Sequence, residues 1–375
     1  MKLKTILIGI LINLFCVSQV FAFKIGRISG INFNSAVKEV YDDNITFVKD
    51  NKKQDFRTDL TIGLSAYLEG KTRNLNIAAS VTQALYTRFK KFNNTSENFS
   101  LDYLQELSRK SRFTVSNDFT HREDPQSLED EFGRTGNRYK YYMNNFNLNY
   151  TRELNKQFTI LCGYSNQLYD PSRSDLRASY LNRGSLEADF IVTSKTILIG
   201  MFEYMHRKFK SSTTIRTSRF AGGIRQYLTN RLYLDCRAGK DYTKASGGNK
   251  SNAQFYSGSL VHEVDDKTRL SVSFMKQDSS SYYATQIFKS TRISLSFVRQ
   301  LFKRLSLAIS GFYGEGKYTD TGRSDLYKGG NMSLTYDITD KIKANMSYNY
   351  SATNSNVEAN DYIRNVGMLG MTIDF

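Results

Sequence analysis

Seven arginines stand at alternating positions of stretches that are typical of β-strands, where they could bind anions. A guanidinium group presents a planar fork of donors that fits a carboxylate, and rings of arginine are one means by which pores favour anions. The residues are Arg57, Arg177, Arg183, Arg219, Arg225, Arg237 and Arg292. We expect Arg177, Arg183, Arg225 and Arg237 to contribute most, because they lie in mid-strand on consecutive predicted hairpins. The predicted chemistry is non-covalent binding of anions along a polar surface.

Carboxylates and further arginines share the same polar face. Arg112 and Arg269 add to its positive charge. Five acids offset that charge in part, namely Asp59, Asp118, Glu187, Asp189 and Asp235. Two interpretations stay open: a positive surface that attracts anions, or cross-strand pairs of arginine and acid that hold the wall together. Three tyrosines of this face could offer flat surfaces to sugar rings, namely Tyr67, Tyr227 and Tyr233.

Residues for covalent or metal chemistry are not gathered in the sequence. The three histidines, His121, His206 and His262, are far apart and share no motif, whereas metal sites need clustered ligands. No phosphate-binding glycine loop or nucleophile elbow is present. The formal net charge is +16, but the basic residues are spread over many strands, which argues against nucleic-acid binding. The sequence therefore predicts a protein with no enzymatic activity, no metal and no cofactor.

A series of short turns indicates the elements that must position the arginines. Each turn is flanked by alternating stretches, and each interval holds two strands and one longer polar loop. The turns lie near Glu69–Thr72, Ser108–Lys110, Arg152–Lys156, Thr193–Lys195, Thr229–Arg231, Asp265–Thr268, Gln300–Arg304 and Ile338–Lys341. Eight turns and a strand at each end predict about eighteen antiparallel strands over residues 36–375, with sixteen as the alternative. A soluble sandwich or propeller would also contain many strands, but it would not require long loops on one side alone.

Alternation of apolar and polar residues predicts that these strands cross a membrane. Phe56, Leu60 and Ile62 alternate with Arg57 and Asp59, and later strands repeat this pattern. We assign the apolar face to lipid and the polar face to a wet interior, and a sheet in lipid must then close. The 25 Tyr, 25 Phe and only 2 Pro fit long unbroken strands. The predicted fold class is an all-β transmembrane antiparallel β-barrel.

Residues 196–204 are apolar at both odd and even positions, so no facing is predicted for them. Cys162 and Cys236 fall on non-neighbouring predicted strands, so we expect two unpaired thiols.

The end of the chain resembles the closing strand of bacterial outer-membrane barrels. Leu369, Met371, Ile373 and Phe375 form one apolar face of residues 366–375. In those barrels the terminal Phe is part of the assembly signal. The resemblance implies that these four residues are read by the barrel-assembly machinery.

The start of the chain predicts export. Lys2 and Lys4 precede an apolar stretch over residues 6–17, and Ala22 offers a small-residue cleavage site. Residues 1–22 are therefore predicted to be a signal peptide, and residues 23–375 a single barrel domain. Together with the strands, this predicts residence in the bacterial outer membrane, in contact with its lipid.

The segment Tyr41-Asp42-Asp43-Asn44-Ile45 and the strand over residues 55–64 resemble the opening of a family of outer-membrane β-barrel porins encoded beside exopolysaccharide gene clusters. Ile62 stands where that family has Pro. The resemblance implies transport of a secreted polysaccharide, with anionic polysaccharide and periplasmic export components as partners. The alternative is a structural or adhesive surface barrel with a filled lumen. About eighteen strands favour a channel, because barrels of that size enclose water.

A long acidic loop over residues 122–137 is the last feature of interest. It contains Glu123, Asp124, Glu129, Asp130 and Glu131. Loops of this length are uncommon unless functional. We consider two roles, a solvated surface loop and a lid that folds toward a basic pore.

Overall fold

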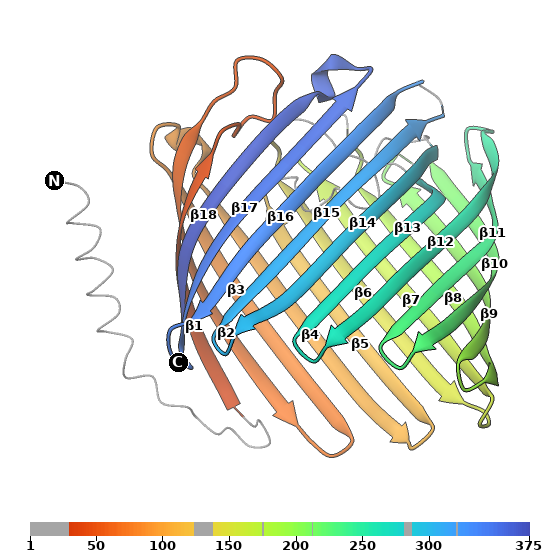
Figure 1. Cartoon of the computed structure of the whole chain (residues 1–375). Helices are drawn as coiled ribbons and strands as arrows, with labels where there is room; N and C mark the ends of the chain where they lie inside the picture. Colours follow the sequence, from red (N-terminus) through yellow and green to blue (C-terminus); the bar gives the residue numbers. More distant parts are fainter. Residues whose placement is uncertain (1–29, 124–137, 175, 212, 281–286, 320–321) are drawn as a thin grey trace.

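The computed structural model describes residues 30–123, 138–174, 176–211, 213–280, 287–319 and 322–375, and it shows one closed β-barrel (Figure 1). Eighteen strands each pair antiparallel with two neighbours, and β1 pairs with both β2 and β18. The predicted fold class is confirmed, and the count is eighteen rather than sixteen. The predicted signal peptide and most of the acidic loop lie outside the described residues.

The strands are long and follow one another around the barrel in chain order. They are β1 (Gly30–Asp42), β2 (Asp55–Glu69), β3 (Arg73–Tyr86), β4 (Asn94–Ser108), β5 (Ser111–Arg122), β6 (Tyr141–Glu153), β7 (Phe158–Pro171), β8 (Ser179–Thr193), β9 (Thr196–Phe209), β10 (Thr214–Thr229), β11 (Leu232–Ala245), β12 (Lys250–Asp265), β13 (Thr268–Ser280), β14 (Ile287–Phe302), β15 (Leu305–Tyr318), β16 (Ser324–Asp337), β17 (Ile342–Ser355) and β18 (Tyr362–Asp374). The short 3-10 helices η1 (Lys90–Phe92) and η3 (Glu358–Asn360) lie between strands. Among the described residues, no helix is long and apolar enough to span a membrane.

All eight predicted turns connect consecutive strands, from β2–β3 to β16–β17. We call this end of the barrel the short-turn end and the opposite end the loop end; the chain's C-terminus lies at the short-turn end (Figure 1). The predicted start at residue 36 was wrong. Residues 30–35 also belong to β1 because they alternate in the same way and pair with β2, from Gly30 opposite Tyr67 to Ser35 opposite Ile62.

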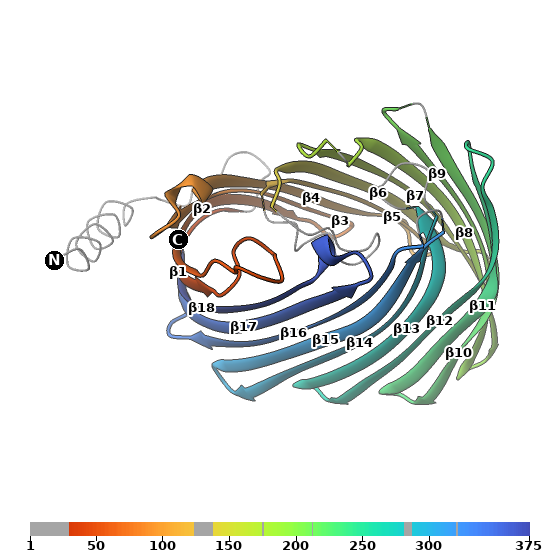
Figure 2. The ribbon, with the colours of Figure 1, turned by 90° about the horizontal axis from the view of Figure 1, so that it is seen from above.

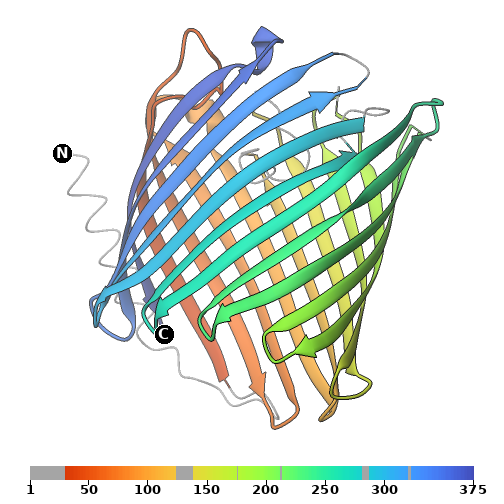
Figure 3. The same cartoon turned by 45° about the vertical axis from the view of Figure 1, so that its right-hand side comes forward.

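The predicted facing of the strands is confirmed by the pairing, since residues directly opposite each other share a face. Phe56 is 54% exposed and Ile62 60% exposed on the outside of β2, whereas Arg57 faces inward opposite Tyr86. The strands are tilted against the barrel axis (Figure 3). Exposed apolar side chains on their outer faces form a band around the molecule.

Strand β9, whose facing the sequence left open, follows the same rule. Leu198 and Phe202 lie outside, and Ile199 is buried inside.

The barrel is elongated in cross-section. Seen from above, β1, β2 and β18 form one narrow end and β8–β11 the other (Figure 2). The two long sides are formed by β3–β7 and by β12–β17. Whatever lines the lumen therefore lies on two long walls and two narrow ends.

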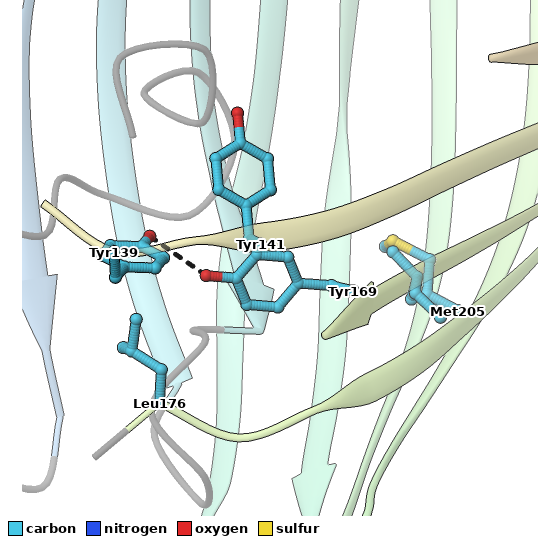
Figure 4. Close-up of a cluster of buried hydrophobic side chains, with 6 residues drawn as sticks. Tyr139, Tyr141, Tyr169, Leu176 and Met205 are labelled. Atoms are coloured by element: carbon cyan, nitrogen blue, oxygen red, sulfur yellow. Dashed lines mark hydrogen bonds between the residues drawn. The ribbon is translucent and has the colours of Figure 1, made fainter. Parts of the chain in front are cut away.

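Apolar clusters pack inside the wall near the loop end. In one of them Tyr139, Tyr141, Tyr169 and Leu176 are buried together with Met205, and the Tyr169 hydroxyl donates to that of Tyr139 at 3.0 Å (Figure 4). Further clusters include Tyr86 on β3 and, on β14–β16, Phe288, Tyr318 and Tyr327. Packing thus stiffens the loop end from within.

A seam joins the first and last strands, and the segment Tyr41–Ile45 fastens its loop end. Asp42 accepts hydrogen bonds from Arg364 at 3.1 and 2.6 Å, and both side chains are almost fully buried. The Asn44 amide donates to the carbonyl of Ile363 at 2.9 Å, and its neighbour Asp43 accepts from the Asn365 backbone at 2.7 Å.

An aromatic ring and an exposed ion pair support this fastening. Phe47, in the left-handed region at φ 54°, lies 4.2 Å from the Arg364 guanidinium and packs edge-on against Tyr362. Lys49 and Asp361 form an ion pair at 3.2 Å, and this hydrogen bond raises the pKa of Lys49. At the short-turn end, the backbone N–H of Phe375 donates to the carbonyl of Phe33 at 2.8 Å.

Candidate functional site: the lumenal wall

The strand pairing places most of the predicted arginines on the inner face. These inward residues are Arg57, Arg112, Arg183, Arg219, Arg225, Arg237, Arg269 and Arg292. Arg177 is the exception, and its predicted place in mid-strand was wrong. It is exposed in the β7–β8 connection because neighbouring Leu176, 3% exposed, turns into the Tyr139 cluster and takes the chain out of the sheet.

One group of ion pairs lies on β8–β11, nearer the loop end. Arg219 donates to both carboxylate oxygens of Asp241, at 2.7 and 3.0 Å, and to Glu203 at 3.2 Å. Arg183 lies 2.9 Å from the same Glu203, and the Arg219 guanidinium lies 4.0 Å from the ring centroid of Phe255. Arg219, Glu203 and Asp241 are buried. A bidentate pair of this kind holds its geometry firmly.

A second group lies on the same strands, nearer the short-turn end. Asp235 accepts from Arg225 at 2.8 Å and from Arg237 at 3.0 Å. Arg237 also donates to Glu187 at 2.6 Å, and Arg225 lies 3.7 Å from Asp189. These side chains are partly open to the lumen. The two groups together form what we call the arginine–carboxylate ladder.

The ladder is close to electrically balanced. Its arginines are Arg183, Arg219, Arg225 and Arg237, and its acids are Glu187, Asp189, Glu203, Asp235 and Asp241. Cross-strand pairing, one of the two interpretations that the sequence left open, is therefore present in this wall. The field of such a wall alternates in sign along the strands instead of being uniformly positive.

Two of these acids were not among the predicted lumenal residues. Asp241 could have been found, because it stands at the same parity as Asp235 and Arg237. Glu203 could not, because it falls in the stretch that is apolar at both parities.

Arg57 and Arg292 have other surroundings. Arg57 lies 2.7 Å from Asp59 and donates to the Tyr86 hydroxyl at 3.1 Å. Arg292 lies 4.2 Å from the centre of the Phe312 ring and donates to Ser294 at 3.0 Å. Both guanidinium groups are thus held against aromatic rings, an arrangement that orients them.

The long walls carry many neutral polar side chains beside inward charges such as Arg292 and Asp102. Thr61 and Thr82 share a hydrogen bond of 2.8 Å. On the opposite wall Asn331 donates to Asn349 at 2.6 Å, and Thr335 donates to Asn345 at 3.0 Å. Such a surface can exchange hydrogen bonds with water and with polar solutes.

The three predicted tyrosines face inward and differ in their surroundings. Tyr227 and Tyr233 pack against each other with tilted rings, whose centroids are 5.5 Å apart. Tyr67 lies opposite Gly30. Cys162 and Cys236 are unpaired and stand on the outer face of β7 and β11.

Comparison with known proteins gives a family model that matches part of the chain, and similar folds. The model of a family described as Putative beta-barrel porin 2 matches residues 256–375. No curated protein matches the chain.

Among solved structures, two outer-membrane proteins of Pseudomonas have a similar barrel. The BenF-like porin from Pseudomonas fluorescens Pf-5 gives a TM-score of 0.50 at 12% identity, over 93% of this chain and 100% of that one. OpdK with vanillate, from Pseudomonas aeruginosa, gives 0.50 at 9% identity over the same shares. The FrpB iron transporter from Neisseria meningitidis gives 0.48 at 10% identity, over 86% of this chain and 62% of that one, so the chain spans less than two thirds of that transporter.

A closed barrel with a polar interior and a continuous apolar exterior is the architecture of bacterial outer-membrane proteins. The chain is accordingly an outer-membrane β-barrel in contact with membrane lipid.

Proposed function

We propose that this outer-membrane barrel is a passive diffusion channel for polar solutes. The observation that carries the proposal is a closed eighteen-stranded sheet whose inner face is lined by threonine, asparagine and paired charges rather than by a continuous apolar core. Barrels of sixteen to eighteen strands are wide enough to leave an aqueous passage. The short-turn end would face the periplasm.

Anions are among the solutes that we expect to pass. Arg57, Arg183, Arg225, Arg237 and Arg292 would supply weak sites along the path, because these partly exposed guanidinium groups still have donors that a passing carboxylate can reach. Arg219, predicted to take part, would instead hold the wall, because it is buried and its donors are taken by Asp241 and Glu203. Because the ladder holds four arginines and five acids, a preference for anions would come from inward arginines outside it, such as Arg292, and we expect it to be mild. Arg177, exposed in the β7–β8 connection, would act at the loop end. A secreted polysaccharide, delivered by periplasmic export components, remains one candidate solute on the likeness of residues 41–64 to the porin family beside exopolysaccharide genes.

Single-channel recording in planar bilayers tests the proposal. We expect stepwise conductance that scales with salt concentration, and a reversal potential that indicates weak anion preference under a KCl gradient. Refolded protein that inserts and shows the heat-modifiable gel shift of a folded barrel, but gives no conductance, would contradict a channel. Clear cation selectivity would contradict the anion pathway alone.

A structural barrel with a filled lumen is the second candidate. The buried clusters around Tyr141, Tyr86 and Tyr318 favour it, because they thicken the wall at the loop end. The same recording separates the two, since a filled barrel would insert and fold without conducting.

A further inference from the structure

A recess of about 640 Å³ opens in the wall of β2–β5, at the short-turn end and away from the arginine–carboxylate ladder. Its inward side chains form two rows across these four strands, because the residues concerned pair directly with one another. The first row is Tyr67, Asn76, Asp102 and Ser116; the second is Glu69, Asn74, Leu104 and Thr114. An aromatic ring, an amide, a carboxylate and a hydroxyl thus stand side by side, with about 5 Å between neighbouring Cβ atoms.

The ring at the end of the first row covers Gly30 of β1. Gly30 is directly opposite Tyr67, and a Cβ added to Gly30 would lie 2.5 Å from the Tyr67 ring. The ring therefore occupies the space where any other residue would have a side chain. Tyr67 is partly exposed and lines the recess, so its ring can pack against the apolar face of a ring-shaped solute.

The carboxylates of this wall differ from those of the ladder. Asp102 is exposed to the lumen, and so is Asp118 one row farther from the short turns. In the part of the chain that the structure describes, no ion pair involves Asp102 or Asp118. Their charge is therefore directed at the solution, so the recess should repel anions and accept hydrogen-bond donors.

We propose that this recess binds one or two pyranose units of a neutral or amine-bearing saccharide that enters from the short-turn end. The volume is in the range of small-ligand sites. The flat Tyr67 ring would take the apolar face of a sugar, and Asp102, Asn76 and Ser116 would take its hydroxyl groups. The inference rests on the proposed channel function for access to the lumen and narrows its substrate class.

Channel block by soluble sugars tests the site. The probes are glucose hexamer, glucosamine hexamer and galacturonate hexamer, each added to one side of a bilayer at a time. We expect the glucosamine and glucose oligomers to block from the short-turn side more readily than from the loop side, and the galacturonate oligomer to block least. Glucose monomer added in the same way distinguishes a site for free sugars from one that needs a chain.

Three substitutions locate the block in the recess. Tyr67→Ala should weaken glucose-oligomer block about tenfold, since loss of a buried stacking contact is of that order. Asp102→Asn should weaken glucosamine block more than glucose block, because it removes charge and keeps the shape. Gly30→Ala should weaken both by displacing the Tyr67 ring. Tyr336→Ala, on the lipid face of β16, is the matched control and should leave block unchanged.

Calorimetric titration of the detergent-solubilised, folded variants separates binding from conduction. Heat of binding that disappears in Tyr67→Ala supports the recess even in a barrel that does not conduct. A conducting barrel that neither binds nor is blocked by any of the three oligomers would overturn the inference and leave the channel intact. Block that survives Tyr67→Ala and Asp102→Asn unchanged would also overturn it.

Discussion

At the scale of single residues, Asp235 has the most direct influence on the charge of the lumenal wall. Its carboxylate accepts from Arg225 on β10 and from Arg237 on its own strand. One negative charge is therefore shared by two guanidinium groups, so removing it leaves both less compensated.

Asp235→Asn should accordingly shift the channel toward anions by a few-fold in permeability ratio, and Arg237→Gln should shift it toward cations. Reversal potentials under a KCl gradient measure both shifts. The double substitution conserves the net charge and is the control, because it should return the reversal potential close to its original value. Two single substitutions that move the potential in the same direction would show that the ladder does not set selectivity.

Strand alternation predicts the facing of individual side chains well and their partners poorly. Arg225 and Asp235 were both placed on the inner face from parity, because a period of two is a local property of the backbone. Their mutual pairing depends on the register between strands, which local sequence does not determine. Arg177 was misplaced because alternation continued past the point where Leu176 draws the chain inward.

At the scale of elements, the segment Tyr41–Ile45, which spans the end of β1 and the start of the following connection, fastens the two ends of the sheet together. Asp42 and Arg364 are 322 positions apart in sequence and form an almost fully buried pair. Removing the buried carboxylate would leave the buried Arg364 guanidinium without its counter-charge. This is costly, because water cannot reach the site to replace the lost partner.

Asp42→Asn should therefore destabilise the folded barrel by about 3–5 kcal/mol, the usual cost of breaking a buried pair. The measurement is the temperature at which the compact form is lost on a gel. Lys49→Met is the control, because it breaks an ion pair whose lysine is 56% exposed and should leave that temperature nearly unchanged. If both substitutions lowered this temperature equally, burial of the Asp42–Arg364 pair would contribute nothing to the stability of the barrel.

The closing strand β18 gives the second prediction at this scale. If Leu369, Met371, Ile373 and Phe375 are read during assembly, deleting Phe375 should reduce the amount of heat-modifiable barrel in outer membranes, and Phe375→Tyr should largely retain it. Deletion also removes the 2.8 Å hydrogen bond to Phe33. Refolding of the deleted chain into detergent micelles separates these effects, because unchanged refolding with failed insertion indicates a lost signal. Normal insertion after deletion would mean that the residue is only a strand end.

The elements themselves were largely predictable, whereas the connections at the loop end were not. All eight short turns were located because each is flanked by alternating strands on both sides. The segment after Tyr41 could be recognised as a motif, but its fold depends on hydrogen bonds to Ile363 and Asn365, which are remote in sequence. The recess at Tyr67 could not be predicted from the sequence either, because its two rows of side chains come from four strands and depend on the register between them.

At the scale of the whole molecule, paired charges and neutral polar groups are unevenly distributed around the elongated lumen. The arginine–carboxylate ladder lies at one narrow end and the Arg57–Asp59 pair at the other (Figure 2). The long sides combine hydroxyl and amide groups with charges such as Asp102 and Arg292. A solute with charged and neutral groups can therefore find hydrogen-bonding partners for both on the lumenal wall, and it can keep part of its hydration water. This arrangement depends on the closed shape and cannot be seen in any one strand.

The acidic loop supplies a prediction about the pore as a whole. Its ends are near each other, since Glu123 and Arg138 lie 3.6 Å apart. If the acids of residues 122–137 act as a lid, deleting residues 124–134 should raise single-channel conductance. Replacing the Asp and Glu residues of this segment by Asn and Gln keeps the length of the loop, and so tests the effect of its charge on conductance separately. Conductance that is unchanged by the deletion would make it a surface loop.

The seam between β1 and β18 also bears on how the chain could be rearranged. Phe375 lies against Phe33, so a short linker could join the last strand to Gly30. New ends could then be opened at an exposed short turn such as Asp265–Thr268, since such turns tolerate interruption. A circularly permuted barrel would retain every strand pair while a different hairpin became the last to be synthesised. Comparing its insertion with that of the original chain would separate the order of synthesis from the geometry of closure.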